Sequence, residues 1–243
     1  MDVLNNRVAA ITGAAGGIGR AVALELAERG CDVGISDVDE EGLRETERLA
    51  ARRGVDVHAQ VVDVAAREAV YDWADAVADY FGRVHMVVNN AGVSVSATVD
   101  DIDYEDFEWL MDINFWGVVY GTKAFLPHLR AADEGHIVNI SSIFGIVASP
   151  TQSAYNAAKF AVKGFTESLR AELEIEGAPI QASTVHPGGV KTDIVRSSRI
   201  GDTGAMDRTP DEVIEEFEEE LARLTPEEAG EIITDIDRAL GDD

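Results

Sequence analysis

The chain has 243 residues, of which 46% are hydrophobic, enough to fill one large core or two small ones. Its 46 acidic and 20 basic residues give a formal net charge of −26, which argues against binding nucleic acids or anionic membranes, because both favour basic patches. No apolar run predicts a transmembrane helix, residues 1–7 lack the features of a signal peptide, and a single cysteine, Cys31, excludes an internal disulfide. We therefore expect a cytoplasmic protein with no nucleic-acid, membrane or metal partner.

The first predicted elements surround a glycine-rich turn. An apolar strand at residues 7–12 is followed by Gly13-Ala-Ala-Gly-Gly17-Ile18-Gly19 and a helix at residues 20–29. Strand, glycine turn and helix in this order are typical of a dinucleotide site, because glycines let backbone N–H groups at the helix N-terminus approach a pyrophosphate. The spacing is G-x-x-x-G-x-G instead of the commoner G-x-G-x-x-G, so a glycine turn without a ligand remains an alternative.

The second predicted strand, residues 31–36, ends at Asp37, which lies 18 residues after Gly19. An acidic residue near this position accepts hydrogen bonds from the adenosine ribose in dinucleotide sites. A carboxylate there would repel a 2′-phosphate, and the neighbouring Val38 offers no positive charge, so NAD is predicted over NADP. The alternative is that Asp37 caps the N-terminus of the helix predicted at residues 39–53.

Strands and helices continue to alternate along the chain. We predict strands at residues 55–62 and 84–88, a helix at residues 65–81 and a long helical stretch at residues 103–129. This order indicates right-handed βαβ units and an α/β fold, a Rossmann-like doubly wound parallel sheet with helices on both faces. Ligands bind beyond the carboxyl ends of such strands, where Asp63 and Asn89 would lie. Asn114, inside the long helix, would need partners for its amide if it is buried.

The strongest chemical pattern lies between residues 137 and 174. Ser142 follows a strand at residues 137–140, and Tyr155 and Lys159 share one face of a helix predicted at residues 153–174. An ammonium about 4 Å from a phenol would lower the tyrosine pKa by about 3 units, which would let Tyr155 exchange a proton near neutral pH. Alone, an exposed Tyr and Lys on an amphipathic helix with a turn serine would be the simpler interpretation.

The last part of the chain begins with a strand at residues 180–185, followed by a turn at Pro187-Gly188-Gly189 on the ligand side of the sheet. Residues 196–210 read as a mobile segment. Residues 211–243 carry 14 acidic and 2 basic residues and predict two helices, each with one apolar and one acidic face. We expect one domain over residues 1–243, with a substrate lid and acidic helices at about 190–224.

Taken together, these motifs resemble the short-chain dehydrogenase/reductase family over about residues 5 to 240. The matching positions are Thr12-Gly13-x-x-x-Gly17-x-Gly19, Asp63, Asn89-Asn90-Ala91-Gly92, Asn114, Ser142, Tyr155-x-x-x-Lys159 and Pro187-Gly188 with Thr192.

The resemblance implies a role for each residue. Tyr155 would be the general acid/base, Ser142 would hold the substrate oxygen, and Lys159 would lower the tyrosine pKa and bind the nicotinamide ribose. Asn114 would anchor a water that continues the proton path. The glycine turn with Ile18 would bind the cofactor phosphates, and Asp37 its adenosine ribose. The remaining cofactor contacts would come from Asp63 and Val64 at the adenine, Asn90 and Gly92 at the centre, and Pro187, Gly188, Val190 and Thr192 near the carboxamide.

The function expected from this resemblance is an NAD(H)-dependent oxidoreductase that interconverts a secondary alcohol and a ketone. Its substrate pocket would include Ile143, Phe144, Val147 and Ala148. Two alternatives remain open, reduction of a 3-oxoacyl thioester and a nicotinamide-binding regulator without turnover. Many family members end in a seventh strand, and residues 240–243 show no such pattern, which puts the usual tetramer contact in doubt. The resemblance implies a homodimer or homotetramer.

Overall fold

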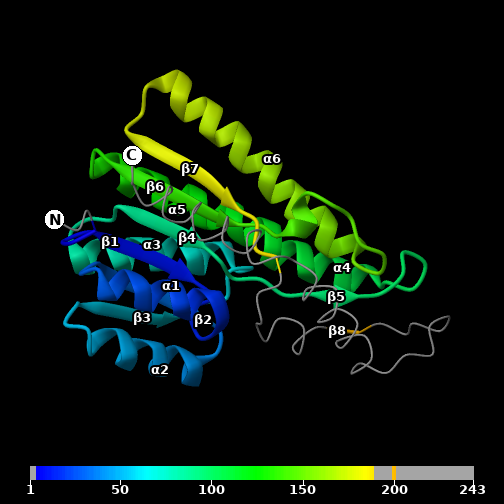
Figure 1. Cartoon of the computed structure of the whole chain (residues 1–243), viewed down its shortest axis with the longest axis horizontal. Helices are drawn as coiled ribbons and strands as arrows, with labels where there is room; N and C mark the ends of the chain where they lie inside the picture. Colours follow the sequence, from blue (N-terminus) through cyan, green and yellow to red (C-terminus); the bar gives the residue numbers. More distant parts are fainter. Residues whose placement is uncertain (1–3, 189–198, 201–243) are drawn as a thin grey trace.

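The computed structural model describes residues 4–188, 199 and 200 and contains a six-stranded parallel sheet (Figure 1). The strand order β3-β2-β1-β4-β6-β7 confirms the predicted doubly wound topology, because β1 lies at the centre and the chain moves outward from it in both directions. The strands are β1 (Val8–Thr12), β2 (Asp32–Asp37), β3 (Val57–Val61), β4 (Met86–Asn89), β6 (Gly135–Ile140) and β7 (Ile180–Val185).

Helices cover both faces of the sheet, as predicted. Successive strand residues point to opposite faces, so Ala9 and Ile11 pack with α1 (Gly17–Glu28) and α2 (Glu40–Ala51), whereas Val8 and Ala10 belong to the opposite core. That second core is completed by α3 (Arg67–Phe81), α5 (Gly117–Ala131) and the C-terminal half of α6 (Ser153–Glu176). All six strands run in one direction, so their carboxyl ends meet at one edge of the sheet.

The long helical stretch predicted at residues 103–129 is confirmed as continuous helix over residues 104–131, but it is not α-helix throughout. It is divided into α4 (Tyr104–Met111), the π-helical turn η1 (Asp112–Trp116) and α5. Asn114 lies in this turn and is completely buried. Its Oδ1 accepts from the Val93 N–H and its Nδ2 donates to the Val93 carbonyl, each at 2.8 Å. The wider turn carries the Asn114 amide at the place where both backbone groups of Val93 can bind it.

A small second sheet was not predicted. It joins β5 (Val95–Ser96) to β8 (Arg199–Ile200), and Arg199 also donates to Asp106 of α4 at 2.6 Å. Strands this short carry no periodic pattern that sequence reasoning can detect. Three predictions concern residues 189–198 and 201–243, which lie outside the described residues. They are the lid, the two acidic helices and the lack of a seventh strand, and they stay predictions. Among the residues described, none of the helices is long and apolar enough to span a bilayer.

Candidate active site

A cavity of about 740 Å³ opens at the carboxyl edge of the sheet. Most of the residues that sequence reasoning assigned to a site line it, although they come from many separate segments. These are Gly13, Gly17, Ile18, Asp37, Asp63, Val64, Asn90, Gly92, Ser142, Tyr155, Lys159, Pro187 and Gly188. Two others, Gly19 and Asn114, are absent from its lining, and Val190 and Thr192 lie outside the described residues.

The glycine turn between β1 and α1 is closed by close backbone packing. Gly13 has a φ of +68°, and a Cβ on Gly19 would lie 2.1 Å from the Gly13 carbonyl oxygen, so neither position accepts a side chain without strain. The Asn90 Nδ2 donates to the carbonyls of Thr12 and Gly13 at 3.0 and 3.1 Å. Asn90 therefore ties the carboxyl end of β4 to this turn.

The start of α1 fits a bound phosphate. The N-cap residue is Gly16, no side chain caps the helix, and a Cβ on Gly16 would meet nothing within 4 Å. The N–H groups of a first helical turn carry partial positive charge and need acceptors. Open space in front of an uncapped N-terminus is the arrangement that binds the phosphate oxygens of a dinucleotide.

Asp37 lies at the end of β2, and its carboxylate is held by two backbone N–H groups. Its Oδ2 accepts from Ala15 at 2.9 Å and its Oδ1 from Asp39 at 3.1 Å. The alternative that Asp37 caps α2 is wrong, because the cap is Asp39, whose side chain accepts from Glu41 and Gly42. Asp37 instead joins the glycine turn to the cavity wall formed by β2.

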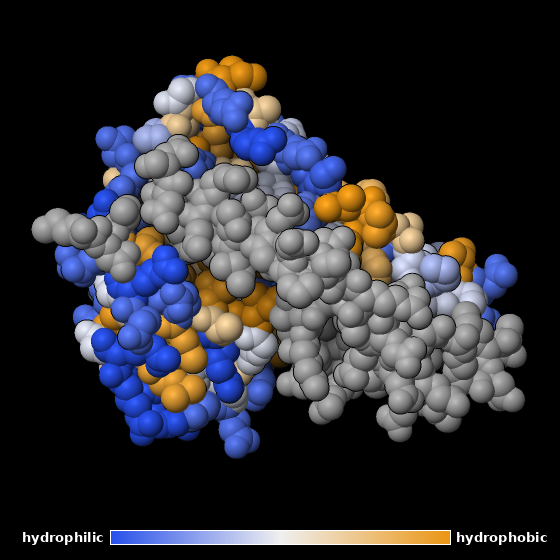
Figure 2. Space-filling model, viewed as in Figure 1, coloured by the Kyte–Doolittle hydropathy of each residue, from blue (hydrophilic) through white to orange (hydrophobic). Residues whose placement is uncertain are grey.

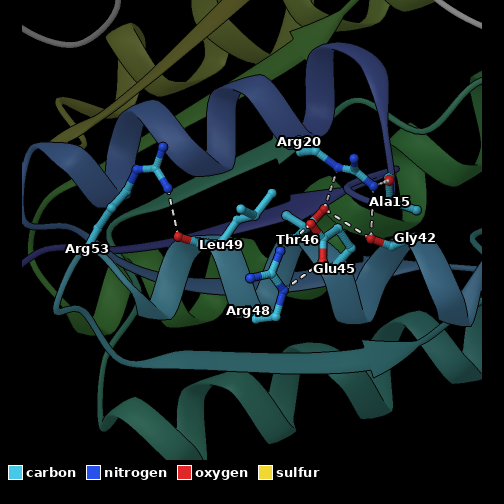
Figure 3. Close-up of polar contacts among 8 residues, drawn as sticks. All are labelled: Ala15, Arg20, Gly42, Glu45, Thr46, Arg48, Leu49 and Arg53. Carbon is cyan, nitrogen blue, oxygen red and sulfur yellow. Dashed lines mark hydrogen bonds and ion pairs between the residues drawn. The ribbon is translucent and has the colours of Figure 1, made fainter.

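Arg20 was missed by sequence reasoning, although it lines the same end of the cavity. Figure 3 shows its guanidinium between the glycine turn and α2, where it donates to the carbonyls of Ala15 and Gly42 and, at 2.9 Å, to the Thr46 hydroxyl. Thr46 in turn donates to the Ala14 carbonyl at 2.8 Å. A cation in the first turn of a helix is repelled by the helix dipole. The three acceptors around the Arg20 guanidinium, the Ala15 and Gly42 carbonyls and the Thr46 hydroxyl, offset this repulsion. Its only sequence signal is a basic residue directly after the glycines.

The predicted trio comes together at the middle of the cavity. Ser142 follows β6 and begins the 3₁₀ turn η2 (Ile143–Gly145), and its hydroxyl accepts from the Phe144 N–H and is hydrogen-bonded to the Tyr155 phenol. One turn along α6, the Lys159 Nζ lies 5.5 Å from the centroid of the Tyr155 ring and donates to the Ile140 carbonyl at 3.0 Å.

The prediction that Lys159 lowers the pKa of Tyr155 by about 3 units is wrong. Burial raises the pKa of Tyr155 to about 12, and the hydrogen bond with Ser142 only reduces that rise. Burial also lowers the pKa of Lys159 to about 8. The ammonium is itself desolvated and donates to a carbonyl, so it does not bring the phenol pKa down towards neutrality. At pH 7 Tyr155 carries its proton and most of Lys159 is charged.

Gly92 allows three segments to meet beside Lys159. A Cβ at this position would lie 3.3 Å from Asn114 Oδ1 and 3.6 Å from Lys159 Nζ. The buried Asn114 amide binds Val93 through both its oxygen and its nitrogen and so fixes the chain just after Gly92. This pairing accounts for a polar residue inside the helix, and the predicted water relay through Asn114 stays a prediction.

Comparison with known proteins agrees with this geometry. The family model described as short chain dehydrogenase matches residues 7–202. The chain belongs to the short-chain dehydrogenase family. A Mycobacterium tuberculosis oxidoreductase that carries the name SadH is 50% identical over 233 residues, which cover 96% of this chain and 83% of that protein.

Solved structures of other short-chain dehydrogenases are also similar. A family member from Burkholderia phymatum, in complex with NAD, has a TM-score of 0.83 at 29% identity and covers 98% of this chain and 86% of its own. Carveol dehydrogenase from Mycobacterium avium, also in complex with NAD, has a TM-score of 0.76 at 32% identity, covering 79% of this chain and 74% of its own.

The substrate side of this short-chain dehydrogenase differs from expectation. Ile143 and Phe144 line the cavity, but the predicted Val147 and Ala148 do not, and Val147 is 52% exposed. After Phe144, none of residues 145–151 lines the cavity. Two polar residues that sequence reasoning missed, Ser94 and Gln152, line this end instead. Gln152 lies three residues before Tyr155, and that helical spacing is the one signal that could have identified it.

Proposed function

We propose that this chain is an NAD(H)-dependent oxidoreductase that interconverts a secondary alcohol and a ketone. The observation that carries the proposal is the meeting of Ser142, Tyr155 and Lys159 in the same cavity as the glycine turn and Asp37. The NAD complexes of the similar Burkholderia and Mycobacterium avium proteins support the choice of cofactor.

Each residue near the reacting carbon has a defined task in this proposal. NAD, when bound, supplies the hydride acceptor, or the donor as NADH. The Tyr155 hydroxyl, protonated at neutral pH, gives its proton to the oxygen of a ketone; in the reverse direction its deprotonated phenolate form accepts the proton of an alcohol. Ser142 hydrogen-bonds the same oxygen and keeps it within reach of the phenol. The charged Lys159, one helical turn away, would offset part of the negative charge left when the phenolic proton leaves, although it does not bring the resting pKa of Tyr155 down to neutrality.

The cofactor contacts are proposals with the same physical basis. Phosphates would lie at the N-terminus of α1, over Gly13, Gly17, Ile18 and Gly19. The adenosine ribose would bind Asp37, and the adenine would lie near Asp63 and Val64, with Asn90 and Gly92 beside the central part. At the nicotinamide end the proposed contacts are Tyr155, Lys159, Pro187, Gly188, Val190 and Thr192.

Cofactor reduction over a panel of secondary alcohols, followed by NADH absorbance, tests the function. We expect turnover with NAD for at least one alcohol. If no alcohol or ketone turns over while NADH still binds, the chain is a binding protein. If only 3-oxoacyl thioesters are reduced, with NADPH preferred, the reductase alternative replaces the proposal.

Replacing Asp37 with Ala is expected to relax the preference for NAD. A carboxylate about 4 Å from a 2′-phosphate costs roughly 1–4 kcal/mol per unit charge, depending on the effective dielectric. The ratio of kcat/KM for NADP to that for NAD should therefore rise about 10- to 100-fold in Asp37→Ala. Asp56→Ala, on an exposed turn before β3, is the control and should leave the ratio unchanged. A parent protein that already prefers NADPH would contradict the role of Asp37.

Arg20→Met is expected to weaken cofactor binding with little effect on chemistry. Loss of the guanidinium removes the donors that hold the Ala15 and Gly42 carbonyls and the Thr46 hydroxyl together. Each such charged hydrogen bond contributes about 1.5–3 kcal/mol, so we expect KM for NAD to rise about tenfold or more and kcat to change less than twofold. Arg44→Met, which removes an exposed ion pair with Glu40, should change neither value. Equal kinetics in the two variants would contradict the assignment.

A homodimer or homotetramer is also proposed. Figure 2 shows hydrophobic side chains on the outer surface of the ridge formed by α6, and Phe160 on this helix is 44% exposed. Trp116, at the end of η1, is exposed to the same extent. Large apolar side chains in such positions favour contact with a second copy.

A further inference from the structure

Gln152 holds a buried amide at the substrate end of the cavity. It immediately precedes α6, is 8% exposed and lines the cavity next to Tyr155. Its Oε1 accepts from the Ser94 hydroxyl at 3.3 Å. Its carbonyl accepts from the Asn156 N–H, and its backbone forms a bridge with Ala97. These contacts fix where the side chain lies.

The other half of the amide is unused within the described part of the chain. Only Oε1 has a hydrogen-bond partner there, and Nε2 has two N–H donors to offer. Nε2 is not among the described buried side-chain atoms that lack a partner, so it faces the cavity, where water or a bound molecule can accept from it. Holding Ser94 needs only Oε1 and leaves both N–H groups of Nε2 available to an acceptor in the cavity.

Gln152 is also the N-cap of the helix that carries the proposed catalytic pair. Residues 152, 155 and 159 follow helical spacing, which places Cβ atoms three positions apart about 5–6 Å from one another. A molecule whose reacting oxygen lies at Tyr155 would therefore have a second atom, two or three carbons away, next to Gln152. Around them Val93, Ile143 and Phe144 give the wall an apolar character.

We propose that Gln152 is a specificity-determining residue and that the substrate carries a second hydrogen-bond acceptor, a hydroxyl or carbonyl oxygen two or three carbons from the reacting one. This inference rests on the proposed function, and it names the substrate class as neutral diols and hydroxyketones. A carboxylate is disfavoured, because the cations lining the described cavity are Arg20, held at the glycine turn, and Lys159, which serves Tyr155.

Binding to the complex of the protein with NADH tests the inference without relying on turnover. Calorimetry would give dissociation constants for cyclohexane-1,3-diol and cyclohexanol in the parent and in Gln152→Leu, which keeps the size of the side chain but removes both polar groups. We expect the diol to bind the parent more tightly than cyclohexanol. Gln152→Leu should weaken diol binding about 5- to 100-fold, the loss expected for one buried hydrogen bond, and change cyclohexanol binding less than twofold.

Gln181→Leu, an exposed glutamine on β7, is the matched control and should bind both alcohols as the parent does. Equal weakening of both alcohols in Gln152→Leu would show a structural role and overturn the inference. A parent that binds the diol no better than cyclohexanol, or binds neither, would also overturn it. Oxidation assays on the same variants separate the two proposals, because selective diol binding without any turnover would sustain the role of Gln152 and contradict the proposed function.

Discussion

Replacing Tyr155 with Phe is expected to lower kcat for alcohol oxidation and ketone reduction by about 10²- to 10⁴-fold, the range for loss of a positioned general acid or base. The variant keeps the ring that packs edge-on against Phe144 and loses only the hydroxyl that is hydrogen-bonded to Ser142. Its dissociation constant for NADH, measured by fluorescence titration, should stay within about twofold to threefold of the parent value. Activity and binding would then separate, as a direct role in proton transfer requires.

Tyr104→Phe is the matched control for this experiment. Tyr104 is 88% exposed at the start of α4, so removal of its hydroxyl should leave kcat, KM and NADH binding unchanged. Retention of more than about a tenth of the parent kcat in Tyr155→Phe would contradict a general acid/base role for Tyr155.

The same site predicts how ketone reduction depends on pH. The pKa of Lys159 is lowered to about 8, so this side chain is charged below that value and neutral above it. The pKa of Tyr155, raised to about 12, keeps the phenol protonated throughout. If the ammonium assists proton release, kcat for reduction is highest below pH 8 and falls as the pH rises through it. A rate that stays flat between pH 7 and 10 would show that Lys159 need not be charged.

Gly121→Ala is expected to destabilise the fold strongly. A Cβ on this α5 residue would lie 2.0 Å from Asn89 Oδ1, inside the packed interface between α5 and β4. Asn89 donates to Asn139 at 2.8 Å and to Thr122 at 3.2 Å, and Asn139 donates to Thr166 at 2.9 Å. Overpacking at such a site costs about 1–3 kcal/mol, and a displaced Asn89 would lose about 1 kcal/mol more for each bond that breaks.

Gly164→Ala, the same substitution at another helical glycine, is expected to stabilise the fold. This exposed α6 position has nothing within 4 Å of an added Cβ, so the change should gain about 0.5–1 kcal/mol from helix propensity alone. Thermal unfolding should therefore show a fall of about 6–12 °C in Tm for Gly121→Ala and a rise of about 1–4 °C for Gly164→Ala. Equal Tm values for the two variants would show that the space beside Asn89 relaxes without cost.

Sequence reasoning identified the parallel sheet because alternating strands and helices leave local, repeated signals. It also brought Asp37, Asp63 and Ser142 to one edge, since each ends or follows a strand, and it placed Tyr155 and Lys159 on one helix face. Asn89, placed at the same edge, does not line the cavity, because its side chain is buried against Asn139 and Thr122. The π-helical turn was missed because residues 103–129 favour helix throughout. The turn is wider because it places Asn114 against the backbone of Val93, 21 residues earlier in the chain, and that contact leaves no local sequence signal. The pKa values were misjudged because the spacing of two side chains does not reveal how deeply both are buried.

Arg20 and Gln152 show a second limit of prediction from sequence. Arg20 acts through Gly42 and Thr46 of the next helix, and Gln152 through Ser94, 58 residues earlier. Neither contact has a local pattern, because each depends on how the elements pack. In both cases the only signal in the sequence was a charged or amide side chain near the start of a helix.

The two hydrogen bonds that the Asp37 carboxylate accepts, from the Ala15 and Asp39 N–H groups, constrain how the preference between NAD and NADP could change. Removing the carboxylate to admit a 2′-phosphorylated nucleotide would also remove the hydrogen bond that ties the glycine turn to Asp37 through Ala15. An evolutionary or engineered switch should therefore pass through a neutral residue that can still accept, such as Ser or Asn, ahead of any basic replacement nearby.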